Sequence, residues 1–127
     1  MEPVAIVTAL ILLQYFYFSI SVGAARGRTG VSAPATSGHP EFDRYFRVQQ
    51  NTLEQLIIVL PSLWLFGTYV DARIAAGLGL VFIVGRFIFA RAYVNDPAKR
   101  TIGFVTGFFA TAILLLGGLG GAVYRMM

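Results

Sequence analysis

The stretch that decides the fold is RYFRVQQNTLEQLIIVLPSLWLFGTYV, residues 44–70. From Leu56 onward it is almost entirely apolar, which is typical of a helix that crosses a lipid bilayer. Its first part carries Arg47, Asn51 and Glu54 at spacings i, i+4 and i+7, so these side chains share one face of an α-helix. The segment therefore predicts a membrane-spanning helix with one polar face near its start.

The composition of the whole chain is that of a membrane protein. Of its 127 residues, 57% are hydrophobic and only 13% are charged, about half the charged share of a soluble domain. There is no cysteine, which excludes disulfides, a thiolate nucleophile and sulfur-based zinc sites. A lone histidine, His39, predicts no metal site. The basic residues lie at the ends of apolar runs, so we expect no nucleic-acid partner.

Four apolar stretches predict an all-α fold, an integral membrane four-helix bundle in a single domain over residues 1–127. Each stretch is long enough for a bilayer core, which needs about 20 residues. We expect the helices at about residues 3–25, 41–70, 72–94 and 98–124.

The connections between these helices are short. Residues 27–40 are rich in Gly, Ser, Thr and Pro and cannot continue a helix. Only residues 71–73 separate the second and third helices, so these should form a tight antiparallel hairpin. Pro61 should bend the second helix, and Asn95 or Asp96 should cap the fourth. The first stretch lacks a basic start, so we interpret it as a retained helix rather than a signal peptide.

The distribution of basic residues predicts the orientation in the membrane. Eight of the ten Lys and Arg residues lie on the side of the first and third connections: Arg26, Arg28, Arg44, Arg47, Arg86, Arg91, Lys99 and Arg100. The opposite side holds only Arg73 and Arg125. Because positive charge is retained on the cytoplasmic side, both connections should face the cytoplasm.

Glycines in the last two helices allow close helix packing. Gly103 and Gly107 are one helical turn apart, and GGLGG follows at residues 117–121. Small residues at such spacing let helices approach closely in lipid. Tight packing within one chain and assembly of several chains both fit this pattern. We favour an oligomer, because four short helices alone enclose little space.

The polar face of the second helix needs a protein or aqueous environment. A charge deep in a bilayer costs about 2.5–3.5 kcal/mol on insertion scales, and such residues are functional candidates by default. An internal network between Arg47 and Glu54 that only pins helices together is the alternative. On the third helix, Arg86 and Tyr93 are seven residues apart and also share one face. Arg100, at the start of the fourth helix, lies at the same end.

Together these residues fit a small zwitterionic ligand with more negative than positive groups. Guanidinium groups bind carboxylates through two parallel hydrogen bonds, and Glu54 would pair with an ammonium. The remaining apolar surroundings would admit a second, lipophilic ligand from the bilayer.

The segment HPEFDRYFRVQQNTLEQL, residues 39–56, closely resembles the signature of the MAPEG superfamily, the membrane-associated proteins in eicosanoid and glutathione metabolism. That signature is, loosely, PEF-x-R-x-x-R-x-Q-x-N-x-x-E. The resemblance continues with Ala25-Arg26, with the spacing of Arg86 and Tyr93, and with the DPAKR turn at residues 96–100. It covers essentially the whole chain.

This resemblance implies a homotrimer that binds glutathione between neighbouring subunits near the cytoplasmic side. Arg47 would bind a glutathione carboxylate, and Asn51 and Glu54 would hold the γ-glutamyl end. The full expected binding set is Arg26, Arg47, Gln49, Asn51, Glu54, Arg86 and Tyr93. Gln55 and Phe89 stand where leukotriene-type enzymes have tyrosines.

Arg100 matches the arginine that stabilises the glutathione thiolate in this family, and it is the expected catalytic residue. Physical chemistry supports this role, because a cation beside a thiol favours the nucleophilic thiolate. A slip of one residue in the turn would instead place Lys99 at the thiol.

The resemblance implies a membrane-bound glutathione transferase that attacks lipophilic electrophiles, or reduces lipid hydroperoxides, for detoxification. The compact chain is similar to bacterial members, which implies a multi-pass protein of the bacterial inner membrane. A non-enzymatic lipid-presenting MAPEG protein is one alternative, although that relative lacks the thiol-activating arginine. A small multidrug transporter is another, although its membrane-embedded glutamate would lie in the first helix.

Overall fold

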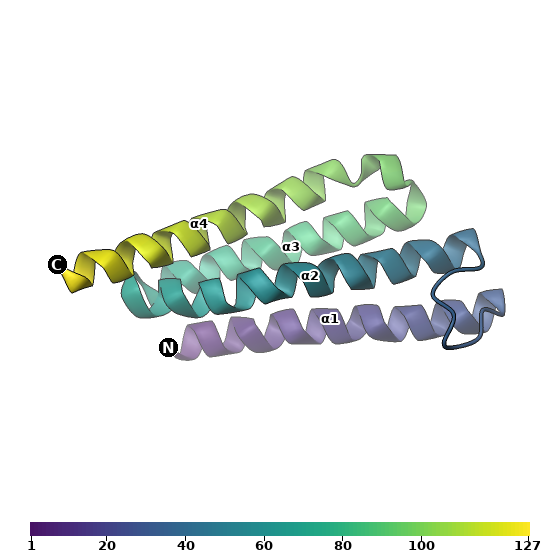
Figure 1. Cartoon of the computed structure of the whole chain (residues 1–127), viewed down its shortest axis with the longest axis horizontal. Helices are drawn as coiled ribbons and strands as arrows, with labels where there is room; N and C mark the ends of the chain where they lie inside the picture. Colours follow the sequence, from purple (N-terminus) through teal and green to yellow (C-terminus); the bar gives the residue numbers. More distant parts are fainter.

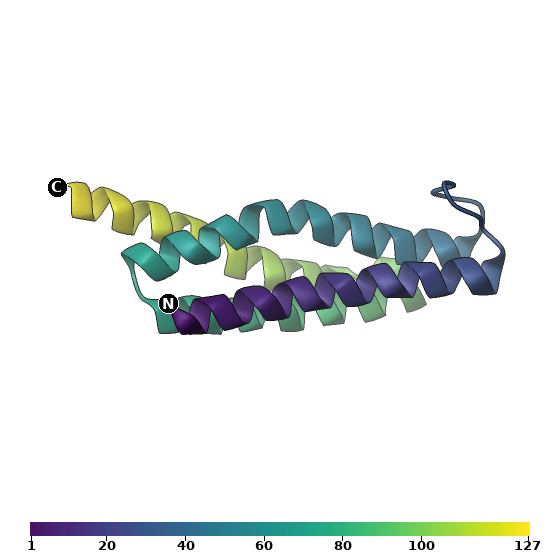
Figure 2. The ribbon, with the colours of Figure 1, turned by 90° about the horizontal axis from the view of Figure 1, so that it is seen from below.

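The computed structural model describes residues 1–127 as a bundle of four long helices (Figures 1 and 2). The elements in chain order are α1 (Glu2–Thr29), α2 (Pro40–Tyr69), α3 (Ala72–Asn95), the 3-10 helix η1 (Pro97–Lys99) and α4 (Thr101–Met126). The chain forms no strand, and all four α-helices are long and apolar enough to cross a membrane. The predicted all-α four-helix bundle is thereby confirmed.

The helices α2 and α3 lie between α1 and α4 (Figure 1). Each of these two central helices packs against both outer helices and against the other. Both chain termini lie at one end of the bundle, and the α1–α2 and α3–α4 connections lie at the other (Figure 1). The end of α1, the start of α2 and the α3–α4 connection therefore lie at the same end of the bundle.

The two ends of the bundle differ in packing. The largest apolar cluster joins all four helices toward the termini and includes Ile11, Leu63, Phe82 and Leu114. Toward the connections the apolar clusters are smaller, such as the one around Phe18. The half that contains the connections therefore leaves more room for polar side chains.

The helix α1 is longer than predicted, because Gly30 rather than Gly27 ends it. Gly30 has a φ of 77°, and its N–H donates to the Arg26 carbonyl at 2.9 Å. Glycine adopts this left-handed conformation at little cost, which makes it a common helix terminator. Arg26 consequently lies in the last turns of α1 and not in a loop.

The helix α4 begins at Thr101, three residues later than predicted. Residues 97–99 form η1 instead, and the Asp96 side chain caps it by accepting from the Ala98 N–H at 3.2 Å. At the α2–α3 hairpin, the Asp71 side chain accepts from the Ile74 N–H at 2.9 Å and so caps α3. The helix α2 runs unbroken through Pro61 and curves along its length (Figure 2).

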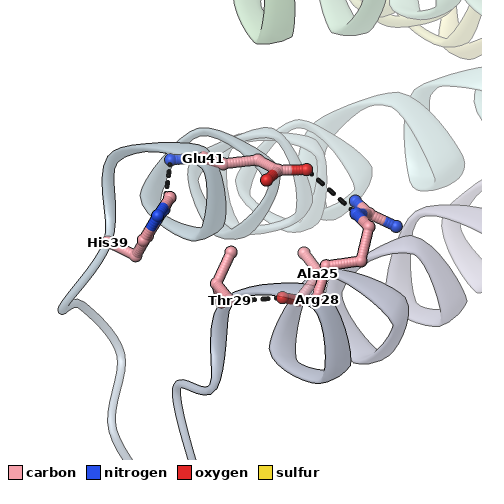
Figure 3. Close-up of polar contacts among 5 residues, drawn as sticks. All are labelled: Ala25, Arg28, Thr29, His39 and Glu41. Carbon is pink, nitrogen blue, oxygen red and sulfur yellow. Dashed lines mark hydrogen bonds and ion pairs between the residues drawn. The ribbon is translucent and has the colours of Figure 1, made fainter.

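Polar contacts fix the end of α1 against the start of α2 (Figure 3). The Arg28 guanidinium donates through Nε to Glu41 Oε1 at 3.0 Å. His39 caps α2, because its Nδ1 accepts from the Glu41 N–H at 3.1 Å. Within α1, the Thr29 hydroxyl donates to the Ala25 carbonyl at 2.7 Å. His39 thus has a structural role that a solvated loop histidine would not have.

Replacing His39 with alanine should lower the free energy of unfolding by about 1 kcal/mol, because one N–H at the start of α2 loses its acceptor. Asparagine at the same position should retain the cap and most of the stability. Thermal unfolding of the three proteins in one detergent checks this. Equal stability of the alanine and histidine proteins would contradict the capping role.

The helices α3 and α4 are in backbone contact at the glycines. A Cβ atom on Gly103 would collide with the backbone nitrogen of Phe89 and lie 2.7 Å from the Gly85 carbonyl oxygen. A Cβ atom on Gly85 would lie 2.9 Å from the Gly107 nitrogen. Close packing within one chain, one of the two interpretations of these glycines, is therefore present.

Candidate functional site

A pocket of about 450 Å³ opens between α2, α3 and the start of α4. We call it the polar pocket, and its walls are Arg47, Asn51, Phe89, Tyr93, Arg100, Thr101 and Phe104. Four residues predicted from the sequence thus meet there: Arg47, Asn51, Tyr93 and Arg100. Two of them are arginines and no wall residue is acidic, so the polar pocket is positively charged and suits anionic groups.

Helical spacing places these side chains. Arg47 and Asn51 are one turn apart on α2, and Phe89 and Tyr93 are one turn apart on α3, with ring centres 5.6 Å apart. Arg100 follows η1, where its Nη1 donates to the Pro97 carbonyl at 2.8 Å.

The position of Arg100 is set by the turn before it. Its guanidinium carbon lies 6.0 Å from the ring centre of Tyr93, within the range of a cation–π contact. Arg100 lines the polar pocket, whereas the neighbouring Lys99 does not. The geometry therefore puts the guanidinium of Arg100, and not the ammonium of Lys99, on the wall of the polar pocket.

Arg86 lies behind Asn51 and is only 1% exposed. Its Nη2 donates to Asn51 Oδ1 at 2.8 Å and to Thr52 Oγ1 at 2.9 Å, and its guanidinium carbon lies 4.2 Å from the ring centre of Phe89. Because the Asn51 oxygen accepts from Arg86, the Asn51 amide nitrogen remains free to donate to a ligand. Arg86 itself is not a wall of the polar pocket.

Two other residues predicted to bind the ligand have partners elsewhere in the chain. Arg26 donates through Nη1 to the Ala35 carbonyl at 2.8 Å, and its guanidinium carbon lies 4.6 Å from the Phe42 ring centre. Gln49 donates through Nε2 to the Ser19 hydroxyl at 3.0 Å. A single chain does not bring either side chain into the polar pocket.

Glu54 shares the face of α2 with Arg47 and Asn51, but it does not line the polar pocket. Its side chain is exposed and forms no ion pair with any residue of the chain. The predicted alternative, an internal network between Arg47 and Glu54, is therefore absent from the single chain. An exposed carboxylate in a membrane-spanning helix needs water or a polar partner from outside that chain.

Sequence reasoning missed three residues at this site. Thr101 and Phe104 line the polar pocket, and Thr52 helps Asn51 to hold Arg86. Phe104 follows Arg100 by one helical turn, and this spacing was the signal that could have identified it. Thr52 gave no such signal, because a threonine among apolar residues usually bonds its own helix, as Thr52 also does with Val48.

The fold defines a multi-pass membrane protein, and the polar pocket is a positively charged cavity at one end of its helix bundle. Comparison with known proteins agrees with the resemblance found in the sequence. The model of the MAPEG family matches residues 4–120. The chain belongs to the MAPEG family.

Several relatives are similar over most of the chain. An uncharacterized protein of Synechocystis, sll1147, is 44% identical over 96% of this chain and 89% of its own length. Human microsomal glutathione S-transferase 2 is 42% identical over 91% of this chain and 80% of its own length. Rat leukotriene C4 synthase is 38% identical over 76% of this chain and 64% of its own length.

Proposed function

We propose that this protein is a membrane-bound glutathione transferase that activates the thiol of glutathione for attack on lipophilic electrophiles. One observation carries the proposal: Arg47, Asn51, Tyr93 and Arg100 converge on one pocket. The similarity to a microsomal glutathione S-transferase supports glutathione as the ligand.

The chemistry of the polar pocket suits glutathione. This tripeptide carries two carboxylates, one ammonium and one thiol, and a volume of about 450 Å³ lies within the usual range of small-molecule sites. Arg47 would bind a carboxylate through two hydrogen bonds. Asn51 would donate its amide N–H groups, because its oxygen already accepts from Arg86.

Arg100 would act on the sulfur. The thiol of cysteine has a pKa near 8.5, and a neighbouring cation lowers it. The thiolate then attacks an electrophilic carbon, a sulfur–carbon bond forms, and the leaving group departs with its electron pair. The protein has no cysteine of its own, so the ligand must bring the nucleophilic sulfur.

The site would be completed in a homotrimer. The polar pocket has no acidic wall residue for the glutathione ammonium, while Glu54 is exposed without a partner. Residues Arg26 and Gln49 also lie outside the pocket of their own chain. Neighbouring subunits that bring these side chains to the ligand would resolve both observations. Native mass spectrometry should show three copies per particle, and a monomer that binds glutathione fully would refute this arrangement.

Replacing Glu54 with glutamine should weaken glutathione binding about tenfold, because a hydrogen bond to a charged group contributes roughly 1.5–3 kcal/mol. The loss should be small for a ligand that lacks the amine. Calorimetric titration with glutathione and with its deaminated analogue measures the loss of affinity for each ligand. An equal loss for the two ligands would place Glu54 away from the amine.

Arg86 would act by positioning Asn51 and not by touching glutathione, in contrast to the contact predicted from the sequence. Methionine at this position has a similar size and removes a buried charge that has no carboxylate partner, so the fold should persist. Glutathione affinity should fall about tenfold, because Asn51 loses its orienting hydrogen bond.

A double-mutant cycle separates positioning from direct contact. In the Asn51→Ala background, Arg86→Met should have no further effect on glutathione affinity, measured by calorimetry. Additive losses from the two changes would instead mean that Arg86 contacts the ligand directly.

The enzymatic proposal is tested with purified protein and glutathione. A transferase should show the ultraviolet absorbance of a bound thiolate and should convert a chlorinated nitrobenzene to its glutathione conjugate. Reduction of a lipid hydroperoxide would add peroxidase activity. Glutathione binding without either reaction would favour a lipid-presenting protein, and no binding at all would refute the proposal.

We further propose that the protein lies in a bacterial inner membrane with the α1–α2 and α3–α4 connections in the cytoplasm. Its lack of cysteine allows a direct test. A single cysteine at Ser37, in the α1–α2 connection, should react with an impermeant thiol reagent only after the cells are opened. Labelling of intact spheroplasts would reverse the orientation.

A further inference from the structure

A second cavity lies on the other side of α3, away from the polar pocket. It has a volume of about 490 Å³ and is formed by α1, α2 and α3. We call it the aromatic groove, and it is lined by Tyr17, Phe18, Ser21, Tyr45, Val48, Phe87, Ala90, Arg91, Val94 and Asn95.

Aromatic rings line the part of this groove that lies farther from the α1–α2 and α3–α4 connections. The ring centres of Phe18 and Phe87 are 6.0 Å apart, and Tyr17 lies 6.0 Å from Phe18 and 6.4 Å from Phe87. The rings of Tyr17 and Phe87 are exposed. In a membrane-spanning chain, an open aromatic surface of this kind is available to an acyl chain.

Polar groups lie at the end of the groove nearer the water. Arg91 follows Phe87 by one turn of α3, and Ser21 follows Tyr17 by one turn of α1. Both helices run toward the same end of the bundle at these residues (Figure 1). The groove is therefore apolar toward the middle of the bilayer and polar at the membrane boundary. A bilayer lipid has the same arrangement, with its acyl chains toward the middle and its headgroup at the boundary.

The charge at the polar end is positive and unpaired. Arg91 is exposed and forms no ion pair, and no acidic residue lines the groove. A second guanidinium, that of Arg44, lies at the rim, where its Nη1 donates to the Val94 carbonyl at 3.1 Å. Arg91, a wall residue, complements a phosphate, which accepts hydrogen bonds from guanidinium groups, and Arg44 adds positive charge nearby.

The aromatic groove is independent of the glutathione site. On α3, Phe87 and Arg91 face the groove, whereas Phe89 and Tyr93 face the polar pocket. On α2, Val48 is buried and faces the groove, whereas Glu54 is exposed and lies about 120° away around the helix, since successive residues are about 100° apart. A neighbouring subunit that contacts Glu54 would therefore approach α2 from a direction different from that of the groove.

We propose that the aromatic groove is a binding site for an anionic phospholipid of the surrounding bilayer. The headgroup phosphate contacts Arg91, and one acyl chain lies against Tyr17, Phe18 and Phe87. A basic side chain that merely reaches toward nearby headgroups would have no groove beneath it. Here α1, α2 and α3 together form the surface against which the acyl chain lies.

The test uses the full-length protein in detergent, titrated with phosphatidylglycerol and with phosphatidylcholine, and bound lipid is measured by native mass spectrometry. Phosphatidylglycerol should bind more tightly. Arg91→Gln should weaken its binding about fivefold, the attraction of one basic residue to an anionic lipid surface. Arg73→Gln is the matched control, because Arg73 is an exposed arginine at the opposite end of α3, and it should leave binding unchanged.

A second variant tests the groove itself. Ser21→Phe should fill its polar end and weaken binding of phosphatidylglycerol while Arg91 remains. Equal effects of Arg91→Gln and Arg73→Gln, no effect of Ser21→Phe, or equal binding of the two phospholipids would each overturn the proposal. Tighter binding of oleate than of phosphatidylglycerol would assign the groove to free fatty acids instead and would also overturn the proposal.

Turnover with glutathione should stay unchanged in Arg91→Gln, because Arg91 lies outside the polar pocket.

Discussion

Replacing Arg100 with glutamine should reduce turnover with glutathione by about 10²–10³-fold, the usual effect of removing one preorganised electrostatic contact. The expected cause is loss of the cation beside the sulfur, which leaves the thiol protonated at neutral pH. Glutathione affinity should change little, because Arg47 and Asn51 remain in the polar pocket. Thiolate absorbance, steady-state turnover and calorimetric binding measure the three quantities separately.

Lys99→Gln is the matched control for this experiment. Lys99 precedes Arg100, carries the same charge and is also exposed, but it does not line the polar pocket. Its replacement should leave the thiolate signal and the turnover unchanged. If Lys99→Gln abolished the thiolate while Arg100→Gln retained it, the role that we assign to Arg100 would belong to Lys99.

Replacing Gly103 with alanine should destabilise the protein by about 3 kcal/mol, the upper part of the range for overpacked cores. The added methyl group would collide with the backbone nitrogen of Phe89 and crowd the Gly85 carbonyl oxygen, and backbone atoms cannot move aside as a flexible side chain can. Because Phe89 and Arg100 both line the polar pocket, separation of α3 from α4 should also weaken glutathione binding. Thermal unfolding and calorimetry check the two effects.

Gly107→Ala, one turn further along α4, distinguishes this collision from a general effect of alanine. The nearest atom to a Cβ on Gly107 would be 3.6 Å away, which is an ordinary contact. Alanine also favours the helix over glycine by as much as about 1 kcal/mol. The variant should therefore be as stable as the native protein or more stable. Equal losses at Gly103 and Gly107 would refute the packing argument.

The sequence predicted the helices well because their apolar stretches are long and periodic. The ends of the helices were less predictable, since they depend on one residue each. Gly27 and Gly30 are both able to end α1, and only the structure shows the left-handed conformation at Gly30. The delayed start of α4 has a similar cause, because proline at position 97 fits the first turn of either an α-helix or a 3-10 helix.

The polar pocket was predictable in its residue types but not in its full geometry. Helical spacing correctly grouped Arg47 with Asn51, and the pocket contains both. The same spacing placed Arg86 and Tyr93 together, yet Arg86 is buried behind Asn51 and is not a pocket wall. Spacing shows which residues share a helix face, whereas the direction of that face and the depth of each side chain depend on the packing of neighbouring helices.

The hydrogen bond from Arg86 to Asn51 has a consequence for ligand selectivity. Because its oxygen already accepts from Arg86, Asn51 presents its amide donors to the polar pocket, as Arg47 and Arg100 present theirs, and its oxygen keeps one further lone pair. Within one chain, the other side-chain acceptors on its walls are the hydroxyl groups of Tyr93 and Thr101, and none of these acceptors is charged. Such a surface repels amines and attracts carboxylates, so under our proposal a single subunit would recognise the acidic parts of glutathione and would need a neighbour to recognise the basic part.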